Sequence, residues 1–244
     1  MSVHKTVVIT GASQGIGAGL VKTFLDKGWS VVATSRRISE ATSFDRAGRL
    51  ELIDGDIGDP KTAERVSQVA VEQFGSIDAL VNNAGVFFTK PFLEYTIEDF
   101  RRLSATNLEG FVHFTKHAVR QMLRQRSGGS VVTITSSLTD HPIAGVKASL
   151  PMITKGGLNA ITKSLALEFA SDNIRVNAVS PGVVDTPLHA TGSRDYLRSL
   201  SPMGTITAVQ EIVDGVIYLT YLTEASNITG EVLHVDNGAH LGKW

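Results

Sequence analysis

Cysteine is absent from the 244 residues of this chain. That absence excludes disulfides, catalysis by a thiolate and zinc sites built on cysteine. Long apolar runs are missing as well, because no stretch reaches the roughly twenty apolar residues that a membrane-spanning helix needs. The first residues also lack the pattern of a secretory signal. We therefore expect a cytoplasmic protein with no membrane partner.

An excess of either charge is also lacking, with 23 Lys and Arg against 24 Asp and Glu and a formal net charge of −1. Basic residues form no run longer than the pairs Arg36-Arg37 and Arg101-Arg102. Nucleic acids and anionic membranes bind concentrated positive charge, so we expect neither as a partner. The remaining composition, 42% hydrophobic and 19% charged, is that of an ordinary globular protein.

Short runs of β-branched and apolar residues alternate with longer segments of helical period. The predicted strands are Thr6–Thr10, Ser30–Thr34, Leu50–Asp54, Ile77–Val81, Ser130–Thr135, Arg175–Val179 and Glu231–Val235. The predicted helices are Gly15–Lys27, one that opens at Pro60, Asp99–Arg126, Pro151–Ala170 and Ala208–Leu222. Repeated strand–helix units with apolar strands indicate a parallel sheet covered by helices. We predict a single α/β domain over residues 1–244, with a seven-stranded, mostly parallel sheet and helices on both faces.

Two irregular segments, Leu138–Leu150 and Val183–Thr207, follow predicted strands at the carboxyl end of the sheet. In an open parallel sheet, ligands bind beyond the carboxyl ends of the strands. We therefore expect these segments to form walls of a pocket for a small-molecule substrate.

A glycine-rich loop with the spacing G-x-x-x-G-x-G follows the first predicted strand and opens the first predicted helix. Glycines let the chain turn tightly and bring backbone N–H groups close to a diphosphate, and the helix N-terminus adds positive potential. Glycines also serve plain turns, so the position between a strand and a helix is what favours a nucleotide site. The residues expected to hold the diphosphate are Gly11, Ser13, Gln14, Gly15, Ile16 and Gly17.

This loop and several later segments resemble the short-chain dehydrogenase/reductase family. The matching segments, in the order of the family, are Thr10–Gly17, Asn82–Gly85, Asn107, Ser136-Ser137, Thr154–Gly157, Pro181–Pro187 and Ile228–Gly238. They span almost the whole chain. The resemblance implies a Rossmann-like, doubly wound fold, an oxidoreductase that uses a nicotinamide dinucleotide, and assembly as a homotetramer or homodimer.

The end of the second predicted strand bears on which dinucleotide is used. An acid there would hydrogen-bond the adenosine ribose and favour NAD, but this chain has Ser35, Arg36 and Arg37. Arg36 can pair with a 2′-phosphate and Ser35 can donate to it. We expect NADP as the cofactor, and NAD is the alternative if both arginines are only solvated surface. The resemblance adds cofactor contacts at Asp56, Ile57, Asn83, Ala84, Gly85, Lys155, Pro181, Gly182, Val184 and Thr186.

The catalytic residues that the resemblance implies are incomplete. Ser137, Asn107 and Lys155 stand where the family has its serine, asparagine and lysine. The family's tyrosine, four residues before the lysine, is replaced by Pro151, which cannot donate a proton. General acid–base catalysis contributes about a hundredfold to ten-thousandfold, so reduction that depends on a tyrosine should be slow.

Pro151 has a structural explanation, because proline is favoured at the first position of a helix. We expect it there, with Ser149 or Leu150 as the preceding cap. A substitute proton donor could be His141, which lies in the loop after Ser137. The alternative for His141 is a histidine that only packs within its loop.

Two further sources of a proton remain open. Lys155 could donate directly or through a water held by Asn107, and Tyr196, which lies in the segment Val183–Thr207, is the one tyrosine that could approach the site. Reduction of an activated double bond would need less help from a proton donor.

Other chemistries are disfavoured. Ser137 lies in no G-x-S-x-G elbow, which argues against a hydrolase. His113 and His117 have the spacing of a metal pair, but no carboxylate accompanies them, so we expect no metal. The leading hypothesis is an NADP(H)-dependent oxidoreductase acting on a small carbonyl, alcohol or activated double bond with an atypical proton donor. The alternatives are a dinucleotide-binding sensor or subunit partner with little redox activity, and a lyase or isomerase.

Overall fold

The structure is a computed structural model that describes residues 4–41, 44, 48–221 and 225–242. A seven-stranded sheet with the order β3-β2-β1-β4-β5-β6-β7 forms its centre. All neighbouring strands are parallel, so the predicted sheet is confirmed and is parallel throughout. The strands are β1 Thr6–Thr10, β2 Ser30–Ser35, β3 Leu50–Asp54, β4 Ala79–Asn82, β5 Gly129–Ile134, β6 Ile174–Pro181 and β7 Val232–Val235.

Helices connect the strands. The α-helices are α1 Gly15–Asp26, α2 Pro60–Phe74, α3 Ile97–Ser104, α4 Gly110–Gln125, α5 Ser149–Glu168, α6 Arg194–Ser199 and α7 Val209–Thr220. Short 3-10 helices are η1 Ile38–Glu40, η2 Phe92–Glu94, η4 Ser137–Thr139, η5 Ala170–Asp172, η6 Pro187–His189 and η7 Ala239–Leu241. One π-helical turn, η3, covers Ala105–Glu109. The predicted end of the last helix, Leu222, lies outside the described residues.

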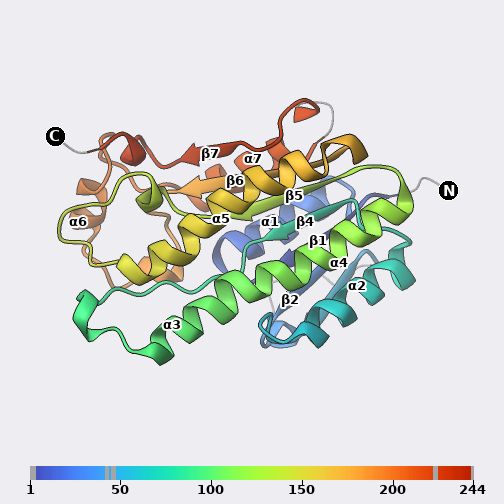
Figure 1. Ribbon diagram of the computed structural model, residues 1–244, viewed down its shortest axis with the longest axis horizontal. Helices are drawn as coiled ribbons and strands as arrows, with labels where there is room; N and C mark the ends of the chain where they lie inside the picture. Colours follow the sequence, from blue (N-terminus) through green and yellow to red (C-terminus); the bar gives the residue numbers. More distant parts are fainter. Residues whose placement is uncertain (1–3, 42–43, 45–47, 222–224, 243–244) are drawn as a thin grey trace.

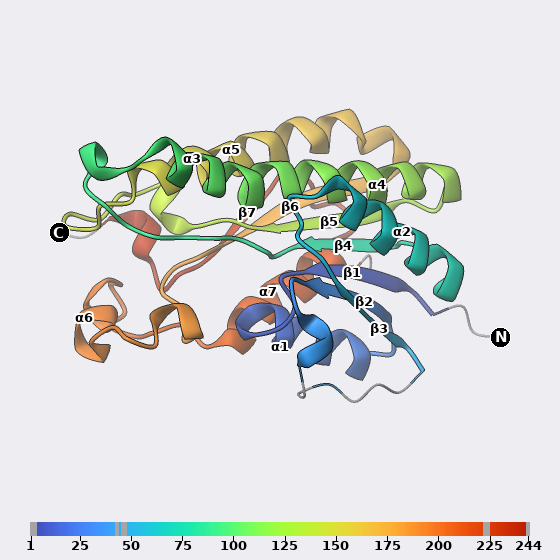
Figure 2. The same cartoon turned by 90° about the horizontal axis from the view of Figure 1, so that it is seen from below.

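The helices lie on both faces of the sheet, as Figures 1 and 2 show. In Figure 2, α1 and α7 lie below the sheet, and α2, α4 and α5 lie above it. Phe24 of α1 and Val216 of α7 are fully buried against one face, and Val66 of α2 and Phe114 of α4 pack on the other. Two apolar cores, one on each face of a single sheet, confirm the predicted doubly wound single domain.

The predicted helix Asp99–Arg126 is divided in the structure. One π-helical turn, Ala105–Glu109, separates α3 from α4. An apolar stripe with a period of 3.6 residues does not reveal the one extra residue that a π-turn inserts. The turn carries Asn107, whose side chain is buried and bonded to the segment after β4.

The start of α5 also differs from the prediction. The helix begins at Ser149 and Ala148 precedes it, so Pro151 is the third helical residue and neither Ser149 nor Leu150 is the cap. Proline is tolerated there because the first N–H groups of a helix have no intrahelical partner to lose. The short helix α6 was not predicted, since six residues are too few to show a periodic stripe.

Candidate functional site

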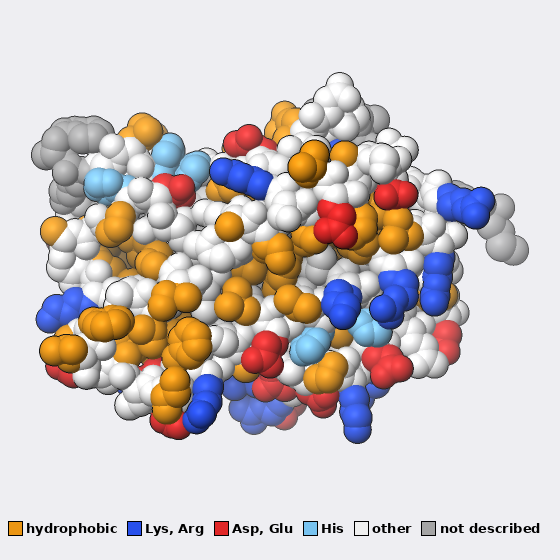
Figure 3. All heavy atoms as spheres, viewed as in Figure 1, with side chains coloured by type: hydrophobic (Ala, Val, Ile, Leu, Met, Phe, Trp, Pro, Cys, Tyr) orange, Lys and Arg blue, Asp and Glu red, His pale blue; other side chains and the backbone are white. Residues whose placement is uncertain are grey.

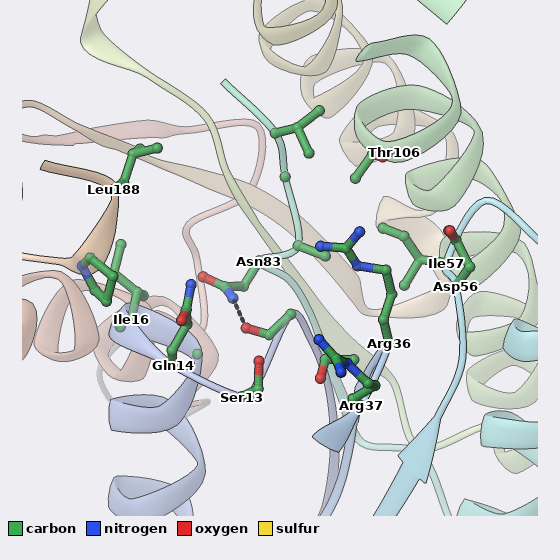
Figure 4. A pocket seen from close by; sticks show the side chains of 18 of the residues that line it. Ser13, Gln14, Ile16, Arg36, Arg37, Asp56, Ile57, Asn83, Thr106 and Leu188 are labelled. Carbon is green, nitrogen blue, oxygen red and sulfur yellow. Dashed lines mark hydrogen bonds between the residues drawn. The ribbon is translucent and has the colours of Figure 1, made fainter. Parts of the chain in front are cut away.

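A cleft of about 910 Å³ opens at the carboxyl ends of β1 to β4. Many residues that the sequence predicts to bind the cofactor line this cleft: Gly11, Ser13, Gln14, Gly15, Ile16, Gly17, Ser35, Arg36, Asp56, Ile57, Asn83, Ala84, Gly85 and Thr186. Residues that sequence reasoning missed also line it: Arg37, Glu40, Gly55, Val86, Arg102, Ala105, Thr106, Pro187 and Leu188. Figure 4 shows these side chains converging from separate loops around one hollow. The cleft has the size of a pocket for a small-molecule cofactor.

Hydrogen bonds and two left-handed glycines fix the conformation of the glycine loop at one end of the cleft. Gly11 and Gly15 have φ values of +64° and +55°, which lie in the left-handed region. Asn83 Nδ2 donates to the carbonyl oxygens of Thr10 and Gly11 at 2.9 and 3.0 Å. A Cβ on Gly17 would overlap the Gly11 carbonyl oxygen and Asn83 Nδ2. The loop therefore brings its backbone close to the cleft, with no side chain at Gly11, Gly15 and Gly17.

The N-terminus of α1 is suited to an anion. Its cap residue, Gln14, makes no side-chain hydrogen bond to the helix, and the first turn holds no acid. Four N–H groups at a helix N-terminus lack partners within the helix, and the helix dipole adds positive potential there. Backbone amides of this turn can therefore bind a diphosphate, so the residues present fit a dinucleotide.

Positive charge gathers where the cleft meets the end of β2. Arg36 and Arg37 follow β2 directly, and Glu40 and Arg102 of α3 line the same cleft. Arg37 is 3.7 Å from Glu40, whereas Arg36 forms no ion pair with any described residue. Figure 4 shows the Arg36 side chain extending beside Ile57. A guanidinium that has no ion-pair partner in the described chain can bind the 2′-phosphate that distinguishes NADP from NAD.

The acid at the end of the neighbouring strand β3, Asp54, already accepts hydrogen bonds from within the chain. Asp54 ends β3, and its carboxylate accepts a hydrogen bond from the Ser39 backbone N–H at 2.9 Å. Hydrogen bonds from Ser39 hold the pKa of Asp54 below its usual value. Asp54 is not among the residues that line the cleft, so it does not offer a carboxylate to a ribose there.

Lys155 and Asn107 meet at the floor of the site, below Gly85. A Cβ on Gly85 would lie 3.2 Å from Lys155 Nζ and 3.4 Å from Asn107 Oδ1. Because Gly85 itself lines the cleft, this pair lies directly behind its wall. Lys155 Nζ donates to the Ile134 carbonyl oxygen at 2.8 Å. Burial lowers the pKa of Lys155 to about 8.

The Asn107 side chain is held rigidly. Its Nδ2 donates to the Val86 carbonyl oxygen at 3.1 Å and to Thr154 Oγ1 at 3.0 Å, and its Oδ1 accepts from the Val86 N–H at 2.9 Å. Both amide hydrogens are therefore used, and only one acceptor position of Oδ1 is left for a water. Sequence alone could not show this, because Val86 and Thr154 belong to other elements.

Ser137 and His141 lie in the segment after β5. Ser137 is buried at the start of η4, and its carbonyl oxygen accepts from the N–H groups of Asp140 and His141 at 3.1 and 3.2 Å. The His141 ring faces away toward the C-terminal segment, since a Cβ on Gly242 would lie 3.1 Å from it. Neither residue is among those lining the dinucleotide-sized cleft.

Three residues expected at the cofactor, Pro181, Gly182 and Val184, are not among the residues that line the cleft. Pro181 is buried at the end of β6, and a Cβ on Gly182 would lie 3.0 Å from Asp236 Cα. Val184 is buried and forms a β-bridge with Thr207. Thr186 does reach the cleft, so this segment meets it from Thr186 onward.

The tyrosines offer no clear substitute donor. Tyr95 Oη donates to the Phe88 carbonyl oxygen at 3.0 Å, and Tyr221 Oη accepts from Trp29 Nε1 at 3.0 Å. Tyr218 is 43% exposed on α7, and Tyr196 is 51% exposed on α6. None of the four lines the cleft, whereas Lys155 Nζ lies next to the cleft residue Gly85.

A second cavity of about 570 Å³ lies next to the segment that follows Ser137, and most of its walls are apolar. Leu138, directly after Ser137, and Met152, directly after Pro151, both line it. The Lys90 N–H donates to the Lys147 carbonyl oxygen at 3.0 Å, which ties its two walls together. The predicted substrate wall 138–150 therefore does enclose a pocket.

Metal ligands and membrane-spanning segments were both unexpected from the sequence, and the structure bears on both in the described part of the chain. No cluster of three or more His, Asp or Glu residues with the geometry of a metal site occurs there, and His113 and His117 gather no third ligand. No helix there is long and apolar enough to cross a membrane.

Known proteins resemble this chain over nearly its whole length. The family model described as Enoyl-(Acyl carrier protein) reductase matches residues 11–240. The chain is 34% identical to L-xylulose reductase from Homo sapiens, over 96% of each protein. The structure of ElxO with NADP bound has a TM-score of 0.88 at 29% identity, covering 98% of this chain and 100% of that one.

A second solved structure holds the other dinucleotide. The 3-ketoacyl-(acyl-carrier-protein) reductase from Brucella melitensis complexed with NADH has a TM-score of 0.88 at 28% identity, covering 98% of this chain and 100% of that one. The family match, residues 11–240, includes the glycine loop from Gly11 to Gly17 and Lys155. This chain belongs to the short-chain dehydrogenase/reductase family and is an oxidoreductase of that family.

Proposed function

We propose that this protein is an NADP(H)-dependent oxidoreductase that transfers a hydride to or from a small carbonyl, an alcohol or an activated double bond. The observation that carries the proposal is one cleft that has the glycine loop at one end and a buried lysine behind its wall. At one end, the loop from Gly11 to Gly17 and the N-terminus of α1 can take a diphosphate. Behind the wall at Gly85, Lys155 and Asn107 lie together.

Each part of the cofactor has a proposed partner. The glycine loop would hold the diphosphate, Ser35 and Arg36 the 2′-phosphate, and Asp56 with Ile57 the adenine. Asn83, Ala84 and Gly85 would line the middle of the dinucleotide. Lys155 would bind the nicotinamide ribose, and the backbone of the segment Pro181, Gly182, Val184 and Thr186 would orient the nicotinamide. When bound, the dinucleotide supplies or accepts the hydride.

Lys155 is the proposed proton donor in place of a tyrosine. Ser137 would hydrogen-bond the carbonyl oxygen of the substrate, and the carbon would receive the hydride. The oxygen would then take a proton from Lys155 Nζ, directly or through a water on Asn107 Oδ1. Because burial lowers the pKa of Lys155 to about 8, its ammonium group gives up a proton more readily near neutral pH. Solvent would later return the proton to the amine.

His141 is the second proposed donor, and the geometry favours it less. Its ring packs against Gly242 and would have to swing toward the substrate. Replacing His141 with alanine distinguishes the two. Unchanged turnover would remove His141 from the mechanism, and turnover lost at constant NADPH affinity would assign it the role.

The apolar cavity beside Ser137 supports a substrate with an apolar part. Leu138, Ile143, Val146 and Met152 line it, so an alkyl, alicyclic or aromatic group would fit there better than a sugar. The reacting carbonyl or double bond would lie at Ser137, and the apolar part would extend into the cavity.

A dinucleotide-binding protein with little redox activity is the second candidate. Pro151 favours it, because the buried position four residues before Lys155 carries no proton donor. In that case the glycine loop and Arg36 would still bind NADP(H), while turnover would be negligible.

The deciding experiment has two steps. NADPH and NADH are first titrated against the purified protein by calorimetry. Ketones and enones that differ in the length of the apolar group are then screened for NADPH consumption, with Lys155→Ala as a control. Turnover that Lys155→Ala abolishes supports the enzyme, and tight binding without turnover supports the second candidate. Failure to bind either dinucleotide would contradict both.

A variant that restores a tyrosine four residues before Lys155 tests whether a missing proton donor limits turnover. Pro151→Tyr would put a phenol four residues before Lys155, on the same helix face. Carbonyl reduction should rise by about tenfold or more if the rest of the site is in place. No gain in a folded variant that still binds NADPH would show that the site differs in more than this residue.

A further inference from the structure

The apolar cavity next to the segment that follows Ser137 carries positive charge without an acid. Its charged lining residues are Lys90 and Lys147, and no Asp or Glu of the described chain lines it. The apolar lining residues include Phe92, Leu138, Ile143, Val146 and Met152. A cavity with these walls suits a molecule that combines an apolar body with one negative group.

The two lysines differ in whether their charge is already paired. Lys90 Nζ forms an ion pair with Asp99 Oδ2 at 2.7 Å and lies 5.7 Å from the centroid of the Phe88 ring. Lys147 is exposed and forms no ion pair with any residue that the structure describes. The ammonium group of Lys147 is therefore available to an anion that enters the cavity.

The backbone of Lys147 is held in place although its side chain is exposed. The Lys90 N–H donates to the Lys147 carbonyl oxygen at 3.0 Å and to Tyr95 Oη at 3.1 Å. Tyr95 Oη in turn donates to the Phe88 carbonyl oxygen at 3.0 Å, and the residue after Lys147, Ala148, is buried. These contacts fix the point where the Lys147 side chain leaves the backbone, so an ion pair there orders only the side chain.

The cavity also adjoins the proposed place of the reacting group. Leu138 directly follows Ser137, and Met152 stands three residues before Lys155. Figure 3 shows hydrophobic side chains gathered at the end of the molecule where the segments before α3 and α5 lie in Figure 1. A substrate with its carbonyl at Ser137 can therefore extend its apolar body along the cavity toward Lys147.

We propose that the substrate is an amphipathic carboxylate, whose apolar chain or ring fills this cavity and whose carboxylate pairs with Lys147. The proposal rests on the proposed function, which places the reacting carbonyl or double bond at Ser137. Lys147 is then a specificity-determining residue that favours an acid over an uncharged compound of the same shape. Because the pair is exposed to water, it should change affinity by about twofold to fivefold.

The first test needs neither cofactor nor turnover. Octanoate and octanol, which share an alkyl chain and differ in charge, are titrated into the protein by calorimetry, with octanoate kept well below the concentration at which it forms micelles. Lys147→Met should weaken octanoate binding by about twofold to fivefold and change octanol binding by less than about twofold. Lys22→Met, which removes the same charge from an exposed lysine of α1, should change neither. Met152→Gln should weaken both ligands, because their shared chain lies against Met152.

A reversal of charge sharpens the comparison. Lys147→Glu should weaken octanoate binding more than Lys147→Met does, and it should strengthen binding of octylamine, whose ammonium group can pair with the new carboxylate. Wild-type protein that does not bind octanoate would overturn the proposal. Equal losses for octanoate and octanol in Lys147→Met, or an equal loss of octanoate in Lys22→Met, would overturn it as well.

The second test connects the cavity to the reaction. A keto acid whose ketone and carboxylate stand at opposite ends of an apolar chain is compared with its methyl ester in the presence of NADPH. In wild type, kcat/KM should be about twofold to fivefold higher for the acid, and this preference should disappear in Lys147→Met. Turnover of ketones without a preference for the acid overturns the proposal and leaves the proposed function standing. Octanoate binding that depends on Lys147, in a protein that turns over no substrate, supports the carboxylate site while the proposed function fails.

Discussion

At the scale of single residues, Lys155 carries the least ordinary environment in the site. Its amine is buried, and a carbonyl oxygen at 2.8 Å is its hydrogen-bond partner. Burial disfavours the charged form and lowers the pKa to about 8 from an ordinary 10.5. The unfolded chain therefore binds more protons than the folded one between about pH 8 and 10.5. Below that window, the full free-energy cost of burying the charged Lys155 lowers the stability of the fold. This cost decreases as the pH rises through the window.

Replacing Lys155 with methionine should therefore stabilise the protein without cofactor. The lowered pKa corresponds to a penalty of about 3 kcal/mol at pH 7. Losing the hydrogen bond to Ile134 costs about 1 kcal/mol in return. The melting temperature of Lys155→Met should rise by about 4 to 8 °C at pH 7 and by clearly less at pH 9.5. A variant less stable than wild type at pH 7, or a difference that does not shrink with pH, would contradict this account.

Arg36 is the residue on which the choice of dinucleotide should depend. It lines the cleft without an ion pair to any described residue, so its charge is available to a 2′-phosphate. Arg36→Ala should weaken NADPH binding by about tenfold to a hundredfold, the worth of a hydrogen bond between charged groups. NADH affinity should change by less than about twofold. Calorimetry measures both, with Arg124→Ala of α4 as the control for lost charge, and equal effects on the two dinucleotides would refute the assignment.

At the scale of elements, the start of α5 forms one wall of the apolar cavity. Met152 lines the cavity, while the next residue, Ile153, is 54% exposed on the outer side. Met152→Gln should raise KM for ketones with a long apolar group by about fivefold, the effect of losing roughly 1 kcal/mol of apolar contact. KM for a small ketone should be unchanged, and Ile153→Gln should leave both values as they are. If Met152→Gln changes neither, the apolar group lies elsewhere.

The elements themselves were largely predictable from sequence. Each buried parallel strand is a short β-branched run, and such runs have few other interpretations when helical segments separate them. The boundaries differ by one or two residues, as β4 shows by starting at Ala79 rather than Ile77. The π-turn at Asn107 was hidden because it changes the helix by one residue without altering its apolar character.

The residues of the candidate site were also only partly predictable from the sequence. Loops that follow a strand, such as the glycine loop, were found from local sequence. Arg102, Thr106 and Leu188 were not found, since they reach the cleft from α3, η3 and η6 only once the chain has folded. Gly182 and Val184 show the reverse case, because their motif was recognisable while their packing against Asp236 and Thr207 was not.

At the scale of the whole molecule, the outer surfaces of α4 and α5 expose apolar side chains. Val112, Leu123, Ile153 and Leu167 are 40%, 39%, 54% and 84% exposed. Two adjacent helices with such a surface suit an interface with a second copy of the chain. We propose that a homodimer or homotetramer forms through this surface.

The oligomer proposal is tested by light scattering after gel filtration. Wild type should elute as a dimer or tetramer, and Leu167→Glu should shift it toward a smaller species. Leu93→Glu, at a residue 94% exposed on η2, serves as the control and should leave the assembly unchanged. A monomeric wild-type protein would refute the proposal.

The strand order has a consequence for synthesis on the ribosome. β1 is made first but lies inside the sheet, between β2 and β4. Its partner for Val8 on one side is Val32, while its partner on the other side, Leu80, is translated much later. Until then, the nascent chain carries an apolar strand with one open edge, which is the kind of edge that recruits other chains. Slow elongation before β4 emerges should therefore lower the yield of folded protein, and a chaperone that covers extended apolar segments should restore it.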